Sequence, residues 1–154
     1  FEELPFANNS YDVLWSQDSI LHSGNRRKVM EEADRVLKSG GDFVFTDPMQ
    51  TDDCPEGVLE PVLARIHLDS LGSVGFYRQV ADELGWQFVE FDEQTHQLVN
   101  HYSRVLQELE AHYDQLQPEC SKEYLDRMKV GLNHWINAGK SGYMAWGILK
   151  FHKP

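Results

Sequence analysis

Two polar segments of the sequence carry residue types that can bind a small molecule or take a proton from it. The first is Ser16-Gln17-Asp18, with His22 four residues after the aspartate, and the second is Asp47-Pro48-Met49. An imidazole accepts a proton near neutral pH, and residues four apart share one face of a helical turn. The residues alone favour a plainer alternative, in which Asp18 caps a turn and His22 lies on the surface.

Each polar segment directly follows a short apolar run that predicts a strand. The runs are residues 11–16 and 43–46, and residues 25–37 between them have apolar positions at helical spacing. We expect Ser39-Gly40-Gly41 to end this helix in the left-handed conformation and Pro48 to end the second strand. Strand, helix and strand form a βαβ unit, and such apolar runs are typical of parallel strands buried on both faces. Ligands of open α/β sheets bind beyond the carboxyl ends of the strands, where both polar segments lie.

The rest of the chain predicts more helices and two further strands. Apolar spacing indicates a helix over residues 58–66 and a second one capped by Ser73 and closed by Gly85. Residues 86–91 predict a strand with Trp86, Phe88 and Glu90 on one face. Two longer helices follow, over residues 98–116 and 121–139, before a closing strand at 144–151. This order predicts a single α/β domain over residues 1–154.

The charge balance and the cysteines limit the class of partner and the compartment. Lys and Arg number 14 against 25 Asp and Glu, and the net charge of −11 argues against binding to nucleic acid or an anionic membrane. No apolar run reaches the length of about 18 residues that a membrane span needs. Cys54 and Cys120 are far apart and unpatterned, which predicts reduced thiols in a cytoplasmic protein, with no disulfide and no metal site.

A series of short motifs resembles a known family in both order and spacing. The motifs are Leu4-Pro5-Phe6, Asn9-Ser10-Tyr11-Asp12-Val13, Ser16-Gln17-Asp18, Leu21-His22 and Arg35-Val36-Leu37-Lys38-Ser39-Gly40-Gly41. Together they resemble the fourth- and fifth-strand region of class I S-adenosylmethionine-dependent methyltransferases. A second set is similar to the sarcosine/dimethylglycine N-methyltransferases that make glycine betaine. It consists of Trp15-Ser16-Gln17-Asp18 with His22, Thr46-Asp47-Pro48-Met49, Gly72-Ser73 with Tyr77-Arg78, His101-Tyr102-Ser103, and Gly131-Leu132 with His134-Trp135-Ile136.

The resemblance covers the whole chain but corresponds only to the C-terminal part of a family member. It implies a portion of a Rossmann-like sheet, with two parallel strands, two further strands and a helical lid over residues 95–139 between the last two. The family's glycine-rich loop and its acidic ribose-binding residue have no counterpart in this sequence. We therefore expect the N-terminal cofactor-binding half to be absent, and this segment alone to be inactive.

The resemblance also implies roles for individual residues in a transfer of a methyl group from S-adenosylmethionine to an amine. Ser16, Gln17 and Asp18 would lie beneath the cofactor. The expected catalytic residues are His22, His101 and Tyr102, because the acceptor amine must lose its proton to solvent or to a nearby imidazole. The expected substrate-binding residues are Asp47, Met49, Arg78 and His134. Aromatic faces suit the positively charged product, and the candidates are Trp15, Tyr77, Tyr102, Trp135 and Trp146.

Alternatives remain open for several of these residues and for the function. Arg78 is equally well explained as an exposed arginine, His134 as a buried histidine with its own hydrogen bonds, and Asp47 as a turn residue at a strand end. The expected function is N-methylation of sarcosine or dimethylglycine. The alternatives are another small-molecule methyltransferase, or a catalytically silent module. We also expect a homo-oligomer, because the strand over residues 11–16 lies unpaired on one side.

Overall fold

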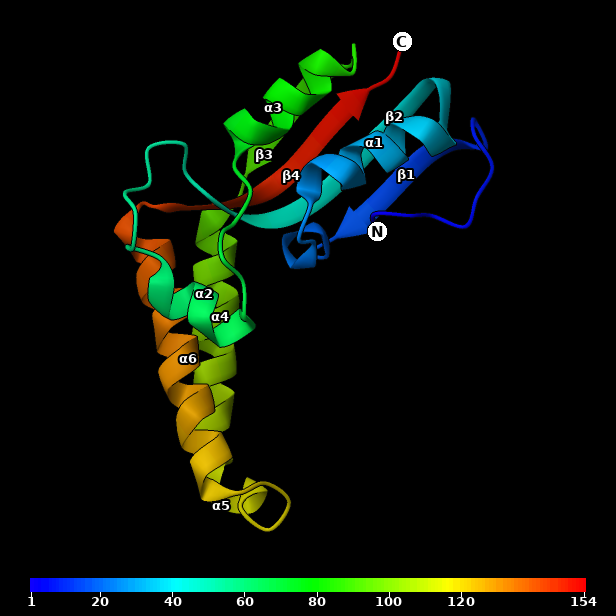
Figure 1. Ribbon diagram of the computed structural model, residues 1–154. Coiled ribbons are helices and arrows are strands. Elements are labelled where there is room, and N and C mark those ends of the chain that lie inside the picture. The colour runs from blue at the N-terminus through cyan, green and yellow to red at the C-terminus, as the bar shows by residue number, and fades with distance from the viewer.

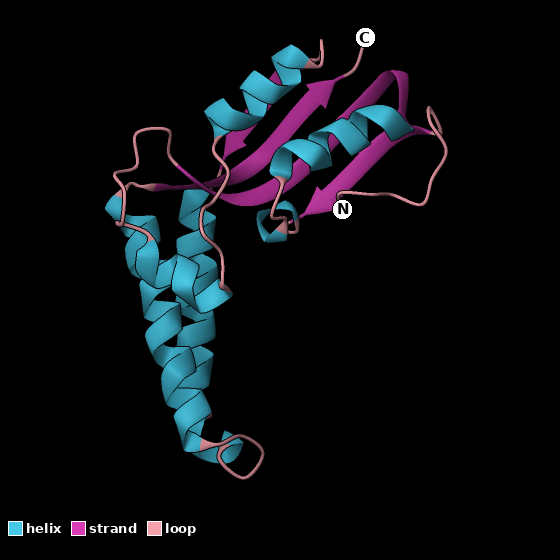
Figure 2. Cartoon of the chain, in the orientation of Figure 1, coloured by secondary structure: helices cyan, strands magenta, loops and turns pink.

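Four strands form one mixed sheet in the order β1-β2-β4-β3 (Figures 1 and 2). The strands are β1 (Tyr11–Gln17), β2 (Leu37–Gln50), β3 (Gln87–Glu93) and β4 (Met144–His152). β1 is parallel to β2, whereas β4 is antiparallel to both of its neighbours, β2 and β3. The computed structural model describes residues 1–154, and it confirms the predicted α/β class with two parallel and two further strands.

The helices divide into a layer on the sheet and an arm that projects from it (Figure 1). They are α1 (Arg26–Val36), α2 (Glu60–Ile66), α3 (Val74–Glu83), α4 (Thr95–Ala111), α5 (Tyr113–Leu116) and α6 (Lys122–Ser141), with a short 3-10 turn, η1 (Ile20–His22), after β1. α1 and α3 cover one face of the sheet. α4 and α6 run side by side to form the arm, and α2 packs against α6.

Side-chain caps fix the starts of two helices where the sequence predicts them. The Ser73 hydroxyl accepts a hydrogen bond from the Phe76 N–H at 3.0 Å, and the Ser121 hydroxyl accepts one from the Tyr124 N–H at 3.2 Å. α1 begins after Asn25, whose side chain accepts from the Lys28 N–H. These local bonds hold α3 and α6 in register with the apolar faces that they bury.

The largest core lies between the sheet and the pair α1 and α3. It includes Met30 of α1, Phe45 of β2 and Tyr77 of α3, each with no measurable exposure. The prediction that residues 11–16 are buried on both faces is wrong. β1 is an edge strand, and Val13 and Trp15 remain 59% and 63% exposed because no helix covers that face.

Gly40 does not end α1, contrary to the prediction. The helix stops at Val36, and Leu37 is already extended. Gly40 instead lies inside β2 with a φ of 81°, a conformation that favours glycine, and its N–H donates to the Lys153 carbonyl. The predicted stop of α6 at Gly139 is also early, since the helix runs to Ser141 and the left-handed residue is Gly142.

Pro48 does not end β2, which continues to Gln50. The Gln50 N–H, two residues on and thus on the same side of the strand, donates to the Gly72 carbonyl away from β4. The side of Pro48 on which another residue would present its N–H therefore points past the end of β1, because the last residue pair between β1 and β2 is Gln17 with Thr46. The proline consequently removes no hydrogen bond from the sheet.

A bulge changes which residues of β3 face the core. The register shifts between Phe88 and Glu90, so Phe88 and Phe91 both pack against the main core. Glu90 is exposed, so the prediction that it shares a face with Trp86 and Phe88 is wrong, whereas those two residues both pack against the main core as predicted. An inserted residue breaks the period of two on which that prediction depended.

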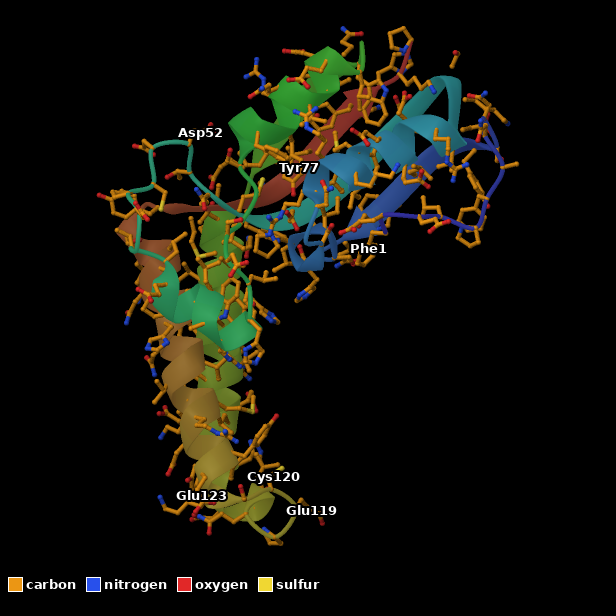
Figure 3. The ribbon with its side chains drawn as sticks, in the orientation of Figure 1. Phe1, Asp52, Tyr77, Glu119, Cys120 and Glu123 are labelled. Carbon is orange, nitrogen blue, oxygen red and sulfur yellow. The ribbon has the colours of Figure 1, made fainter.

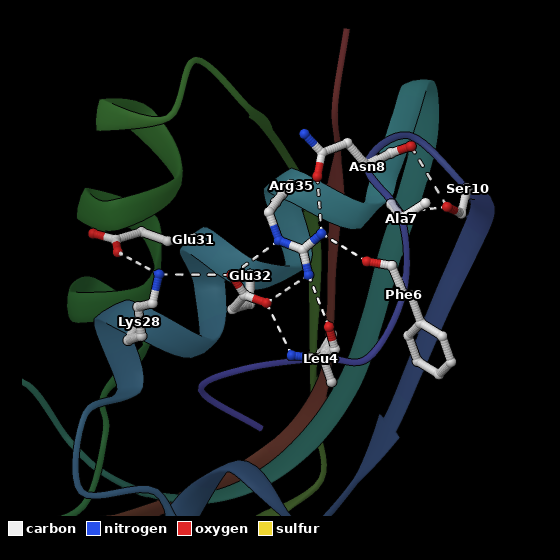
Figure 4. A network of polar contacts seen from close by, with 9 residues as sticks. All are labelled: Leu4, Phe6, Ala7, Asn8, Ser10, Lys28, Glu31, Glu32 and Arg35. Carbon is white, nitrogen blue, oxygen red and sulfur yellow. Dashed lines mark hydrogen bonds and ion pairs between the residues drawn. The ribbon is translucent and has the colours of Figure 1, made fainter.

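A polar network ties the segment before β1 to α1 (Figure 4). Glu32 accepts hydrogen bonds from the Arg35 guanidinium and from the Leu4 N–H. Arg35 in turn donates to the carbonyls of Leu4 and Phe6 at 3.0 and 2.8 Å. The Arg35 hydrogen bond, aided by that of Leu4, lowers the pKa of Glu32 to about 2. The network thereby fixes the chain where it enters β1.

The helical arm has its own apolar packing. Leu98 and Trp135 belong to a cluster at its base, whereas Leu109, Leu125 and Leu132 form a separate cluster farther out. Cys120 lies at the tip of the arm, far from the sheet (Figure 3). No helix in the structure has both the length and the apolar composition that a membrane crossing requires.

Candidate active site

A cavity of about 450 Å³ lies where the carboxyl end of β1 meets the base of the arm. Residues from the turn after β1, from α4, from α6 and from β4 contribute to its wall. The lining residues are Gln17, Asp18, Leu21, His22, Pro48, Ile66, Gln97, Leu98, His101, Tyr102, Trp135 and Trp146. The cavity therefore brings together Gln17, Asp18, His22, His101 and Tyr102, which the sequence analysis selected separately.

Asp18 is held at the wall of this cavity by contacts from two other strands. The Trp146 indole N–H donates to Asp18 Oδ1 at 2.8 Å, and the Asp18 N–H donates to the Thr46 carbonyl at 3.0 Å. Asp18 has a φ of 46°, a left-handed conformation that aspartate tolerates better than most residues. Its carboxylate accepts from β4 rather than capping η1, so the turn-cap alternative is wrong for Asp18, whereas His22 is exposed, as the same alternative expected.

Aromatic rings form one side of the cavity. Tyr102 of α4 stacks on Trp135 of α6, with ring centroids 4.9 Å apart and planes inclined by 25°. His101 meets the edge of Tyr102 at 5.2 Å. Burial raises the pKa of Tyr102, so its phenol keeps its proton at neutral pH and remains a hydrogen-bond donor. Ring faces beside the Asp18 carboxylate favour a cationic ligand.

Asp47 supports the cavity from behind instead of lining it. Its Oδ1 accepts from the Leu21 N–H at 2.8 Å and its Oδ2 accepts from the Tyr77 hydroxyl at 2.7 Å. Arg26 donates to the Leu21 carbonyl at 2.9 Å, so both polar groups of the Leu21 backbone are held. Burial raises the pKa of Asp47 to about 7 and that of Tyr77 well above its usual value. This clamp fixes η1 and the adjoining His22.

Gly72 is required where Tyr77 meets Asp47. A Cβ on Gly72 would lie 2.6 Å from the Tyr77 hydroxyl oxygen, inside van der Waals contact. Tyr77 belongs to α3 (Figure 3), and its side chain has no measurable exposure. Any larger residue at position 72 must displace the Tyr77 hydroxyl, which donates a hydrogen bond to Asp47.

The other residues selected from the sequence lie outside the cavity. Ser16 lines a separate apolar hollow beside the N-terminal segment, which it shares with Gln17. Met49 is buried in the main core. Arg78 places its guanidinium 4.6 Å from the ring centre of Phe88. His134 lines a separate hollow between α2 and α6. Two of the aromatic candidates also lie outside the cavity, since Trp15 is exposed and Tyr77 is buried.

Sequence reasoning missed Gln97, the polar residue that α4 adds to the cavity wall. The available signal was its spacing, since Gln97 and His101 are four apart and share a helical face. The lining contains one carboxylate, two imidazoles, two side-chain amides and a phenol, but no lysine or arginine. No cluster of three or more His, Cys, Asp or Glu side chains is arranged to hold a metal ion. This donor set suits a small organic cation.

The sequence of the chain is close to those of known methyltransferases. It is 96% identical over 154 residues to the sarcosine/dimethylglycine N-methyltransferase of Aphanothece halophytica, covering all of this chain and 56% of that protein. The resemblance to methyltransferases is confirmed. A family model described as a methyltransferase domain matches residues 1–45. The enzyme of the same name from Halorhodospira halochloris is 53% identical over 153 residues, which are 99% of this chain and 55% of that enzyme.

Solved structures agree with the methyltransferase similarity. A Galdieria sulphuraria protein assigned as a sarcosine dimethylglycine methyltransferase superimposes with a TM-score of 0.92 at 41% identity, covering 99% of this chain and 56% of that one. A Haemonchus contortus phosphoethanolamine N-methyltransferase, bound to phosphomonomethylethanolamine and S-adenosylhomocysteine, has a TM-score of 0.84 at 18% identity and covers 97% and 35%. The latter likeness concerns the fold alone. The chain spans just over half the length of the two sarcosine/dimethylglycine N-methyltransferases described above.

Proposed function

We propose that this chain forms the acceptor side of an S-adenosylmethionine-dependent N-methyltransferase that acts on sarcosine and dimethylglycine. The observation that carries the proposal is the single cavity in which Asp18 and two imidazoles face stacked aromatic rings. Its volume of about 450 Å³ is ample for a small amino acid, and the two relatives described above carry this activity in their names. The product of two successive transfers is glycine betaine.

Different residues of the cavity bind the amine and remove its proton. Asp18 attracts the amine as its ammonium form, and the Trp146 bond keeps the carboxylate in place. His22 or His101 accepts the ammonium proton, which frees the nitrogen lone pair for attack. The rings of Tyr102 and Trp146 then face the positive charge that persists on the methylated nitrogen.

We place the cofactor at the carboxyl end of β1, along Ser16, Gln17 and Asp18. Gln17 lines both the cavity and the hollow that contains Ser16, so a ligand in that hollow would adjoin the acceptor. Bound there, S-adenosylmethionine supplies a methyl group on a positively charged sulfur. The Asp18 carboxylate fits that charge, and Asp47 acts through Leu21 to keep the surrounding turn rigid.

Residues 95–139 act in this proposal as a lid. α4 supplies His101 and Tyr102, and α6 supplies Trp135, so the arm forms one wall of the cavity. Excluding water from this junction strengthens the attraction between Asp18 and a cationic acceptor. The glycine-rich strand–turn–helix of the family is not among these 154 residues, and we infer that they do not turn over substrate alone.

Enzyme assays on a full-length protein test the proposal. Here a full-length protein is a chain as long as the relatives that contains these 154 residues. With S-adenosylmethionine and dimethylglycine, we expect conversion to glycine betaine, detected by mass spectrometry. His22→Ala and His101→Ala should each lower kcat/KM, and the larger loss, about 100-fold, identifies the proton acceptor. His96→Ala, exposed on the same helix α4, is the matched control. Absence of product from both sarcosine and dimethylglycine would reject the proposal.

Calorimetry on the 154-residue chain separately tests its cofactor binding. We expect no heat from S-adenosylhomocysteine at millimolar concentration, and measurable heat from the full-length protein. Heat with the short chain would instead show that these 154 residues bind the cofactor on their own.

A further inference from the structure

We propose that Gln97 recognises the acceptor's carboxylate, and that its neutral amide selects carboxylate over phosphate. The inference rests on the proposed function and goes beyond it, because it names the group that decides which amine is accepted. Gln97 lines the cavity from α4, one helical turn before His101. The amide and the imidazole therefore lie on the same face of α4, the face that lines the cavity.

The orientation of the Gln97 amide is set by a neighbour on the same helix. The Asn100 side-chain N–H₂ donates to Gln97 Oε1 at 3.2 Å. This bond occupies the amide oxygen, while the Gln97 nitrogen donates to no protein acceptor. Two N–H groups remain for an anionic ligand oxygen. Asn100 is thus a positioning residue, and Gln97 is the residue that contacts substrate.

The charges around the cavity determine which anion this amide accepts. Asp18 carries the single formal charge in the lining, and no lysine or arginine contributes to the wall. Two guanidinium groups lie outside the lining: Arg26 donates to the backbone carbonyls of Leu21 and Ser70, and Arg65, whose charge acts on Tyr102, packs against Gly131 of α6. A carboxylate with one negative charge needs only neutral donors. A phosphate dianion beside Asp18 would be repelled without a compensating cation.

Kinetics with matched acceptors in the full-length protein test the role of Gln97. Gln97→Ala should raise the KM for dimethylglycine about tenfold and change kcat little, because a hydrogen bond to a charged group is lost. The KM for N,N-dimethylaminoethanol, which lacks the carboxylate, should stay the same. Asn100→Ala should raise the dimethylglycine KM about threefold. Gln107→Ala, exposed farther along α4, should match wild type.

The phosphate analogue tests the selectivity. Wild type should use N,N-dimethylaminoethyl phosphate at least about 100-fold less efficiently than dimethylglycine, and Gln97→Lys should narrow that gap. An unchanged dimethylglycine KM in Gln97→Ala would overturn the inference, as would a tenfold rise in Arg65→Ala instead. These results differ from a failure of the proposed function, in which wild type would convert neither sarcosine nor dimethylglycine.

Discussion

The indole nitrogen of Trp146 lies 2.8 Å from Asp18 Oδ1 and donates to it, although the two residues are 128 positions apart in the chain. The bond joins β4 to the turn after β1 across the end of β2. It also fixes the one carboxylate in the cavity wall. The acceptor side of the site is therefore complete only when the last strand has been added to the sheet.

Trp146→Phe should reduce activity while preserving the aromatic wall. The substitution removes the indole donor, so Asp18 is left in the cavity without its partner and loses its fixed position. A hydrogen bond to a charged group contributes about 1.5–3 kcal/mol, which corresponds to a fall in kcat/KM of roughly 10- to 100-fold. Steady-state kinetics of the full-length protein with dimethylglycine measure this loss.

Tyr124→Phe provides the control for the Trp146 variant. Tyr124 is 47% exposed on α6 and lies outside the cavity, so the loss of its hydroxyl should leave kcat/KM unchanged. Equal losses in both variants would show that the Trp146 effect comes from the loss of any aromatic polar group and not from Asp18.

Local patterns predicted the β1-α1-β2 unit because each of its elements forms from its own residues. The apolar spacing of α1 and the serine caps of α3 and α6 involve neighbours in sequence. Strand ends were less predictable, since Pro48 is accommodated only because β1 stops at Gln17. The bulge in β3 likewise depends on pairing with a strand more than fifty residues away.

The candidate site was predictable in part for the same reason. Asp18, His22 and His101 follow from motifs, whereas their arrangement around one cavity requires the arm to pack on the sheet. Asp47 shows the limit most clearly. Its position after a strand predicts contact with substrate, yet its carboxylate bonds Leu21 and Tyr77 and lies behind the cavity wall. Sequence cannot distinguish a lining carboxylate from one that supports the lining.

Asp47 should make stability fall as the pH rises from about 4 to about 7. Burial raises its pKa from the usual 3.8 to about 7, so within this range the folded protein binds a proton that the unfolded chain does not. The resulting stabilisation is fully present below the unfolded pKa and is lost as the pH passes the folded pKa, a change on the order of 3 kcal/mol. Denaturant unfolding of wild type and Asp47→Asn between pH 4.5 and 8.5 measures it.

Two variants test whether Asp47 causes this dependence of stability on pH. The free energy of unfolding of Asp47→Asn should lack this dependence on pH, so the stability of the variant relative to that of wild type should increase with pH. Tyr77→Phe removes a donor that lowers the pKa of Asp47, and the loss of stability should then extend to higher pH. Parallel curves for wild type and Asp47→Asn would contradict the assignment.

Gly72→Ala should destabilise the protein and disturb the same clamp. The added methyl group would lie 2.6 Å from the Tyr77 hydroxyl, which must move away from Asp47. Overpacking of this kind costs about 1–3 kcal/mol, which thermal or denaturant unfolding detects. Gly24→Ala is the control, because a Cβ at that position meets nothing within 4 Å. Equal effects of the two substitutions would exclude the Tyr77 contact as the cause.

Trp15→Lys should reduce self-association of the 154-residue chain. β1 is an edge strand, and its uncovered face exposes the apolar side chains of Trp15 and Val13. Unpaired backbone groups beside apolar side chains favour pairing with a second copy, and a lysine on the edge opposes it. We therefore expect a mass above that of the 17.8 kDa monomer by light scattering, rising with concentration, and a shift toward the monomer in Trp15→Lys.

Val130→Lys adds the same charge on the exposed surface of α6, far from β1, and should associate like wild type. A monomeric wild-type chain at every concentration would show that the β1 edge does not drive assembly.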